Sequence, residues 1–427
     1  MREEFVQFIW RYQKLPGPNF KSIQGESIVV HKVGMHNFGA GPDFFNSKIE
    51  INGQVWAGNV EIHLKSSDWY VHGHETDPNY DNVILHVVWE DDVPIFRKDQ
   101  TQISTLAVKD LVPKSVLNSY KKLVLRSRRK FINCENDFAS VNNLIVKSWL
   151  ERLYIERLEQ KSELIYKLLE TSNNDWEKVL FCLLMKNFGL NSNGEAFLSI
   201  ASRIDFHLVR KVGYDLQKIE ALFFGTAGLL DETDCSDAYF LQLKQEFGFL
   251  KNKFQLNAMG SFRLSFFGVR PNNFPTIRLS QVANLYHKNP NLFDLIIRAK
   301  TVDQFRTIFD LGTSAYWEDH YTFGKISKSR KKKLTHQFIA LLIINTIVPI
   351  KFCHAKYSGK SISEDLITLM IALKPEKNTF IQQFDNLGLK TVNAMESQSK
   401  LHLYHTYCSK NQCLQCAIGA ELLNRKV

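Results

Sequence analysis

Residues 27–65 read SIVVHKVGMHNFGAGPDFFNSKIEINGQVWAGNVEIHLK, and this stretch decides the fold of the N-terminal part. Apolar residues alternate with polar ones on both sides of Asn52-Gly53, the dipeptide most typical of a two-residue hairpin turn. We therefore expect two antiparallel strands joined at this turn. A further strand pattern at residues 83–91 and a short amphipathic pattern at residues 4–14 add another strand and a preceding helix.

These elements predict an N-terminal α+β domain with a mixed β-sheet over residues 1–112. From Pro113 onward, apolar residues recur at spacings of three and four, which is typical of amphipathic helices. This pattern predicts a large all-α domain over residues 113–394. A C-terminal helix and a cysteine-rich segment are expected over residues 395–427.

The composition of the 427-residue chain is that of a globular protein, with 44% hydrophobic and 23% charged residues. The most apolar run, residues 338–349, is shorter than the roughly 18 residues that a membrane span needs, and we expect a buried helix there. The N-terminus lacks the pattern of a signal peptide. Seven cysteines, an odd number, argue against a disulfide framework. We therefore expect a cytoplasmic protein with no membrane partner, and the sequence does not indicate its oligomeric state.

Charge is divided unevenly along the chain. Residues 1–112 hold 10 Lys/Arg and 15 Asp/Glu, whereas the remainder holds 44 and 29. A basic body beside an acidic segment suits a polyanionic partner such as nucleic acid. Two basic runs with aromatic neighbours supply candidate phosphate contacts, Arg128 and Arg129 in one and Lys331 and Lys332 in the other. Solvated charges without such a partner are the alternative.

Carboxylates in the predicted hairpin are candidate metal ligands. Because side chains alternate along a strand, Glu61, His63 and Lys65 share one face. Asp43 stands at the start of the neighbouring strand, so the hairpin can bring it alongside Glu61. Two such carboxylates suit a hard cation such as Mg²⁺, and a nearby lysine can stabilise developing charge. An exposed pair of Glu61 and Lys65 without a metal is the alternative.

Pro42-Asp43 followed by the E-x-H-x-K strand at residues 61–65 resembles the signature of the PD-(D/E)XK nuclease superfamily. The resemblance covers about residues 1–95 and implies a nuclease-like core of a helix followed by a small sheet. It implies that Asp43 and Glu61 bind Mg²⁺ or Mn²⁺ and that the protein hydrolyses phosphodiesters.

Two positions depart from the superfamily pattern or extend it. The superfamily has lysine where this chain has His63, and Lys65, two residues further along the same face, is expected to take its role. The resemblance also implies an acidic residue from the first helix, for which Glu4 is the candidate. Because degenerate members of this fold exist, a non-catalytic nucleic-acid-binding or scaffold protein is the alternative.

A histidine cluster lies close to the same strands. His63, His72, His74 and His86 fall within 24 residues, with Trp69 among them. With nearby aspartates, these imidazoles could hold Zn²⁺ or Mn²⁺ and make the protein a different metal hydrolase, although no spacing such as H-E-x-x-H is present. Otherwise Trp69, His72 and His74 are expected to line a substrate groove.

Three cysteines near the C-terminus, Cys408, Cys413 and Cys416, form a second candidate metal site. The Cys-x2-Cys spacing places two thiolates together, as in zinc sites and iron–sulfur clusters. A fourth ligand is needed, and His405 is the first candidate, with His402, Cys353 and His354 as others. Reduced cysteines packed between helices, without a metal, are the alternative.

The whole chain also resembles a bacterial family of uncharacterised proteins that is described only as a domain of unknown function. The resemblance rests on residues 41–49 (GPDFFNSKI), 58–69 (GNVEIHLKSSDW), 72–74 (HGH), 84–90 (ILHVVWE), 270–285 (RPNNFPTIRLSQVANL), 343–349 (IINTIVP) and the final cysteines. It supports the expected domain layout and implies no activity.

Overall fold

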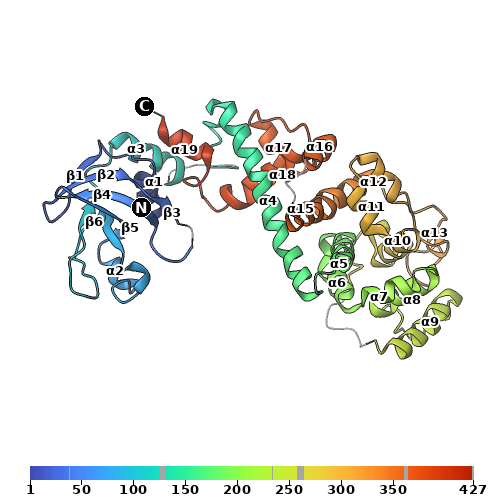
Figure 1. Cartoon of the computed structure of the whole chain (residues 1–427). Helices are drawn as coiled ribbons and strands as arrows, with labels where there is room; N and C mark the ends of the chain where they lie inside the picture. Colours follow the sequence, from blue (N-terminus) through green and yellow to red (C-terminus); the bar gives the residue numbers. More distant parts are fainter. Residues whose placement is uncertain (38, 126–130, 233, 257–263, 360–363, 426–427) are drawn as a thin grey trace. The chain divides into compact units, whose positions relative to one another are not determined.

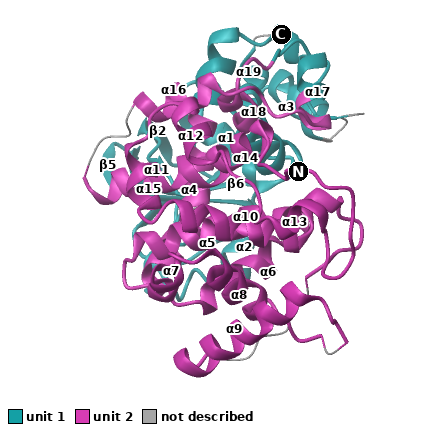
Figure 2. Ribbon diagram, turned by 90° about the vertical axis from the view of Figure 1, so that its right-hand side faces the viewer, with its two compact units in different colours: residues 1–151, 382–390, 400–427 teal, residues 152–381, 391–399 magenta. Residues whose placement is uncertain are grey.

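The computed structural model describes residues 1–37, 39–125, 131–232, 234–256, 264–359 and 364–425 (Figure 1). They form two compact units, coloured separately in Figure 2. Unit 1 comprises residues 1–151, 382–390 and 400–427, and unit 2 comprises residues 152–381 and 391–399. A mixed sheet near the N-terminus and a largely helical remainder confirm the predicted α+β class.

Unit 1 is built on a seven-stranded mixed sheet in the order β1-β2-β4-β5-β6-β7, with β3 paired to β4. Neighbours from β1 to β5 are antiparallel, whereas β5, β6 and β7 run parallel. The strands are β1 (Asn19–Lys21), β2 (Ser27–Lys32), β3 (Met35–His36), β4 (Phe44–Ile51), β5 (Gln54–Lys65), β6 (Val83–Glu90) and β7 (Thr105–Ala107). Because β5 and β6 are parallel, the chain must cross over between them. The crossover contains α2 (Asp68–Val71) and η1 (Pro78–Tyr80).

The hairpin between β4 and β5 turns at the predicted dipeptide. Asn52 and Gly53 both have positive φ, of 52° and 80°. A two-residue type I′ turn requires positive φ at both positions, which Asn and Gly tolerate best. The turn joins Ile51 to its cross-strand partner Gln54.

A bulge near the other end of β4 decides which side chains share a face. The register shifts by one residue between Phe44 and Ser47, so that Phe44 pairs with Val60. Asp43, the next residue outward, therefore lies opposite Glu61. Without the bulge Asp43 would be opposite the following position of β5, whose side chain points to the other face.

One face of the sheet is covered by α1 (Glu3–Arg11), whose apolar residues recur on one side of the helix. The C-terminal segment completes the same core, because Leu414 and Leu423 belong to it, the latter in α19 (Ala417–Asn424). The core of unit 1 also includes Phe5, Phe8, Ile9, Phe44, Val60, Ile62, Leu85, Leu106 and Ala420.

The face that carries Glu61 and His63 is closed by the crossover segment. Trp69 of α2 is only 1% exposed. Its ring lies against His86 of β6 and, edge-on, against Tyr80 of η1. Polar side chains on this face are consequently removed from solvent.

The remaining helices of unit 1 are α3 (Lys114–Tyr120), the π-helical η2 (Lys121–Leu125) and η6 (Leu403–Cys408), and η3 (Phe138–Ser140).

Unit 2 is an assembly of helices around one large apolar core. Aspartate side chains at residues 175, 205, 215 and 237 accept backbone N–H groups at the starts of four of these helices, as N-caps do. Three helices include residues of both units: α4 (Asn143–Thr171), α17 (Thr379–Asn386) and α18 (Ala394–His402). The others are α5 (Trp176–Phe188), α6 (Leu190–Arg203), α7 (Phe206–Val212), α8 (Leu216–Thr226), α9 (Ala238–Phe254), η4 (Pro271–Asn273), α10 (Pro275–Lys288), α11 (Leu292–Arg298), α12 (Val302–Ile308), α13 (Tyr316–Asp319), α14 (His336–Leu342), η5 (Ile343–Ile347), α15 (Val348–Tyr357) and α16 (Glu364–Ala372).

The apolar run at residues 338–349 belongs to a longer helix. The helix runs from His336 to Tyr357 through α14, η5 and α15. By length and composition alone it could cross a membrane, but 67% of its most apolar window is buried inside the structure. Leu342 and Ile347 lie in the core of unit 2.

Candidate metal-binding active site

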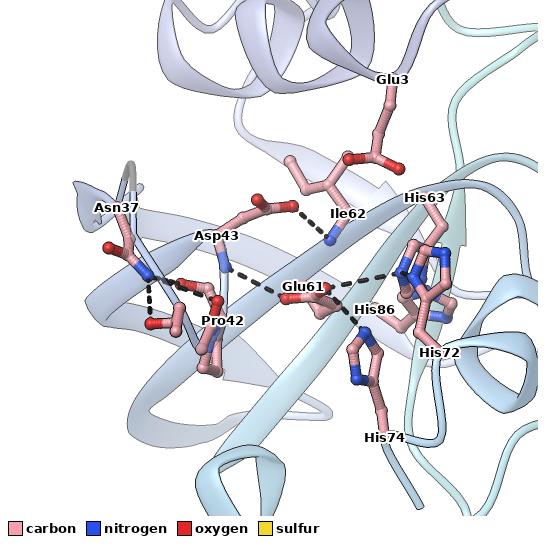
Figure 3. A network of polar contacts seen from close by, with 12 residues as sticks. Glu3, Asn37, Pro42, Asp43, Glu61, Ile62, His63, His72, His74 and His86 are labelled. Carbon is pink, nitrogen blue, oxygen red and sulfur yellow. Dashed lines mark hydrogen bonds and ion pairs between the residues drawn. The ribbon is translucent and has the colours of Figure 1, made fainter. Parts of the chain in front are cut away.

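Asp43 and Glu61 form the centre of a polar cluster on the sheet (Figure 3). The backbone N–H of Asp43 donates a hydrogen bond to Oε2 of Glu61 at 3.1 Å. The carboxylate of Asp43 accepts the backbone N–H of Ile62 through Oδ2, also at 3.1 Å. These contacts bring together two of the sequence-predicted site residues from neighbouring strands. Glu61 is 5% exposed, so one of the two acids is almost fully removed from water.

Asn37 fixes the loop that presents Asp43. Its side-chain Nδ2 contacts the carbonyl oxygens of residues 39–42 at 3.0–3.3 Å, and its backbone N–H donates to the carbonyl of Asp43 at 2.7 Å. Gly41 in this loop has a φ of 92°, which a residue with a side chain rarely adopts. The Asn37 amide thus closes the turn before β4 (Figure 3). Sequence reasoning missed this role, because no pattern links an asparagine to the loop that follows it.

The first helix contributes Glu3 and Gln7 to the site. Nε2 of Gln7 donates to Oδ1 of Asp43 at 2.9 Å and to Oε1 of Glu3 at 3.2 Å. The two helix residues are four apart and therefore lie on one face of α1. The acid that the helix brings to Asp43 is thus Glu3 rather than the predicted Glu4, which is one position, or about 100°, further around the helix.

Histidines of β5 and of the crossover segment meet Glu61 from its other side. Oε1 of Glu61 lies 3.3 Å from Nε2 of His74 and 3.5 Å from Nε2 of His63. His63 contacts His72 through Nε2 at 3.1 Å and His86 through Nδ1 at 2.8 Å. Candidate ligand atoms of His63, His72 and His74 all lie within 4.8 Å of one another. The site therefore combines carboxylate oxygens with three imidazoles.

Burial shifts the pKa values of this cluster toward neutral forms. The pKa of Asp43 is raised, first by burial and then by the charge of Glu61, and burial also raises the pKa of Glu61. Burial and the charge of Asp43 raise the pKa of Glu3 to about 7. Burial lowers the pKa of His63 to about 2, so this imidazole is neutral and keeps a lone pair. Three acids with raised pKa values thus lie close to His63, His74 and His86, whose pKa values are lowered by burial.

Such a donor set fits a divalent cation. Carboxylate oxygens suit Mg²⁺ and Mn²⁺, and neutral imidazole suits Mn²⁺ and Zn²⁺. A cation between Asp43 and Glu61 would offset the burial that raises both pKa values and the charge of Glu61 that raises the pKa of Asp43 further. The carboxylate oxygens of both acids already have partners that orient them. Gln7 contacts Asp43, and His74 contacts Glu61.

Lys65 lies at the end of β5, away from the histidines that flank Glu61. Its side chain is 61% exposed, and its Nζ is 3.9 Å from Asp92. Among the described contacts, Lys65 is therefore linked to Asp92 and not to Asp43 or Glu61. The buried position two residues after Glu61 is held by His63 instead.

The predicted groove of Trp69, His72 and His74 needs one correction. Trp69 is buried in a small apolar cluster with Tyr80, Val83, Ile95 and Ile103, so it cannot contact a substrate. Its indole instead supports His74, which it meets edge-on. His72 is exposed and is the member of this trio that a substrate can reach.

Lys332 also needs correction as a nucleic-acid contact. Its side chain is 4% exposed, and Nζ donates to the backbone carbonyls of Trp317, Glu318 and His320 in unit 2. A lysine whose three protons are bound internally cannot neutralise a phosphate. Its neighbour Lys331 is exposed, whereas Arg128 and Arg129 lie outside the described residues.

The three C-terminal cysteines line one cavity in unit 1, together with Cys134. Sequence reasoning missed Cys134, because more than 250 residues separate it from the others. The predicted fourth ligand His405 is exposed, and Cys353 is buried in the core of unit 2. Burial raises the pKa of the Cys134 and Cys416 thiols, the latter to about 11.

Comparison with known proteins gave one match. Residues 3–379 match the model of a family described as "protein of unknown function (DUF2851)". No curated protein and no solved structure matches significantly. The matched residues include the cluster around Asp43 and end before Cys408.

Proposed function

The chain belongs to the DUF2851 family, as the whole-chain resemblance predicts, and since the description of that family names no activity we propose from the site itself that unit 1 is a metal-dependent nuclease. Asp43 and Glu61 would hold a divalent cation, Mg²⁺ or Mn²⁺. The observation that carries this proposal is the convergence of these two acids, both with raised pKa values, just before β4 and within β5. Acids with strongly raised pKa values cluster at functional sites, and a bound cation would compensate the charge of these two.

The order of elements around the two acids supports the proposal. The chain runs from α1 through β2, β4 and β5, which are antiparallel, and then through α2 to β6, which is parallel to β5. Pro42-Asp43 precedes β4, and Glu61 lies within β5. This is the arrangement that the resemblance to the PD-(D/E)XK superfamily implies, namely a helix, a strand after Pro-Asp, and a strand that carries the second acid.

The replacement of the superfamily lysine by His63 changes how charge must be supplied. A neutral imidazole, unlike a lysine, adds no positive charge beside the reacting phosphate. A bound divalent cation supplies that charge and makes a water molecule more acidic. His74 would position Glu61 by its contact at Oε1, and Gln7 would position Asp43. Glu3, with a pKa of about 7, is available as a third oxygen ligand or as a proton acceptor.

Nucleic acid is proposed as the substrate because of the charge of the chain. Residues 113–427 carry 44 basic and 29 acidic side chains. Such an excess attracts a polyanion and releases counterions when it binds one. A protein that binds nucleic acid without cleaving it would share this feature, so only an assay of cleavage separates the two functions.

We expect the purified full chain to cleave DNA or RNA in Mg²⁺ or Mn²⁺ and to be inactive in EDTA. Single-stranded and double-stranded forms of both polymers should be incubated with each metal, and the products should be resolved on denaturing gels. Binding should be measured in parallel at several salt concentrations, and it should weaken as salt rises. Salt-dependent binding without cleavage of any substrate in either metal would reject catalysis and favour the non-catalytic alternative.

A hydrolase that uses a transition metal is a second candidate, favoured by one observation. The ligand atoms of His63, His72 and His74 lie within 4.8 Å of one another, close enough to surround one ion after small side-chain rotations. Three imidazoles and one carboxylate are a donor set that Zn²⁺ accepts. This candidate predicts that zinc copurifies with the protein. It also predicts that the ligands of the zinc ion include His72 and not Asp43.

A further inference from the structure

Four cysteines from two distant segments line a single cavity in unit 1. Cys134 comes from the segment before α4, and Cys408, Cys413 and Cys416 come from the last 20 residues of the chain. Leu123, Asn133, Tyr407 and Gly419 complete its lining. Four of the seven cysteines of the chain thus converge at one place, although no disulfide joins any of them.

Hydrogen-bond donors point at the sulfur atoms. The side chain of Asn133 donates to Sγ of Cys413 at 3.3 Å. Cys416 is the N-cap of α19, the end of the helix at which backbone N–H groups lack partners within the helix. Donors of this kind stabilise a thiolate more than a neutral thiol, and they surround the sulfur ligands of metal centres for that reason.

Gly419 permits the close packing of the two cysteine segments. A Cβ atom at this position would lie 2.0 Å from the carbonyl oxygen of Cys413, so any side chain would push the loop and the helix apart. The first turn of α19 therefore lies directly against the loop at Cys413 and faces the cavity. The backbones of the loop and the helix are thus in close contact at the cavity, which holds the cysteines of both segments near one another.

We propose that Cys134, Cys408, Cys413 and Cys416 together ligate an iron–sulfur cluster. A single Zn²⁺ with bonds of about 2.3 Å requires its sulfur ligands to lie about 3.8 Å apart. Among the described residues, no three of these cysteines have their sulfurs within 4.8 Å of one another. Wider spacing of the four sulfurs suits a larger inorganic core, which four thiolates hold in both common cluster types.

Assembly of the centre would release one proton from each thiol, because the ligands are thiolates. No electron transfer is required for the proposed role, which is structural. The cluster would join the segment at Cys134 to the end of the chain, whose residues Leu414 and Leu423 complete the core of unit 1. This inference is independent of the nuclease proposal, since it uses none of the residues around Asp43.

The test is the iron and sulfide content of the full chain, purified without oxygen. We expect about four iron and four acid-labile sulfide per chain, or two of each for the smaller cluster type. Visible absorption that bleaches on reduction should accompany them. Protein that contains neither iron nor sulfide, and takes up neither during anaerobic reconstitution, would overturn the proposal. One equivalent of zinc in place of iron would also overturn it.

Variants then test the ligand set. Cys134→Ser should lose most of the iron and lower the Tm, although its side chain differs by one atom. The matched control is Cys235→Ser, at a part-buried cysteine of unit 2 that does not line the cavity, and it should retain full iron content. His405→Ala should also retain it, because that imidazole is exposed. Full iron content in Cys134→Ser, or loss in both controls, would contradict the assignment of the four ligands.

Discussion

Replacement of Asp43 by Asn should lower the rate of metal-dependent cleavage at least about 100-fold, since even the partners of metal ligands change activity 10- to 100-fold. Asparagine has nearly the same shape and can still accept the backbone N–H of Ile62 through its side-chain oxygen. It lacks the negative charge that a cation requires. The variant should therefore remain folded while it loses affinity for Mg²⁺ and Mn²⁺.

Stability measurements separate this loss of charge from a loss of structure. In EDTA the Tm of Asp43→Asn should equal or exceed that of the wild type, because one of two mutually repelling acids has been neutralised. Addition of Mn²⁺ should raise the Tm of the wild type and leave that of the variant nearly unchanged. Glu50→Gln, on β4 outside the cluster, is the matched control and should behave like the wild type. An Asp43→Asn variant that cleaves at the wild-type rate would show that Asp43 does not hold the catalytic cation.

Replacement of Lys332 by Met should destabilise the protein by about 3 kcal/mol or more, because several buried carbonyls would lose their donor at about 1–3 kcal/mol each. Met fills much of the same volume but donates no hydrogen bond. The carbonyls of Trp317, Glu318 and His320 would then lie in the interior without the Lys332 ammonium. Urea unfolding followed by far-ultraviolet circular dichroism, which reports on the helices of unit 2, measures the change.

Lys331 provides the matched control for this prediction. Its side chain is exposed, so Lys331→Met should change the free energy of unfolding by no more than about 0.5 kcal/mol. If nucleic acid contacts this surface, Lys331→Met should weaken binding and lower its salt dependence, whereas the stability should stay constant. Equal stability of the two variants would contradict an internal role for Lys332.

The sequence indicates local features well and the geometry of the cluster only in part. The turn at Asn52-Gly53 is predictable because it depends on two adjacent residues that tolerate positive φ. The bulge between Phe44 and Ser47 is not, since the register of a hairpin depends on packing across both strands. Strand alternation alone therefore places Glu61 and His63 on one face but cannot say that Asp43 joins them.

Contacts between distant segments explain the remaining differences. The sequence analysis predicts Glu4 as the acid from the first helix, but the rotation of α1 against the sheet brings its neighbour Glu3 to Asp43 through Gln7. Cys134 reaches the C-terminal cysteines because the end of the chain returns to unit 1. Lys332 belongs to a basic run whose composition is typical of exposed residues. Its side chain is nevertheless buried, because its amine donates to three backbone carbonyls.

Anomalous diffraction from a crystal of the full chain soaked in Mn²⁺ is the most direct test of the divalent-cation site. The proposed function predicts a peak between the carboxylates of Asp43 and Glu61, at bond lengths of about 2.0–2.6 Å from an oxygen of each. The same crystal form of Asp43→Asn should lack that peak. A peak surrounded by His63, His72 and His74 without Asp43, or no peak in this cluster at all, would contradict the site as described.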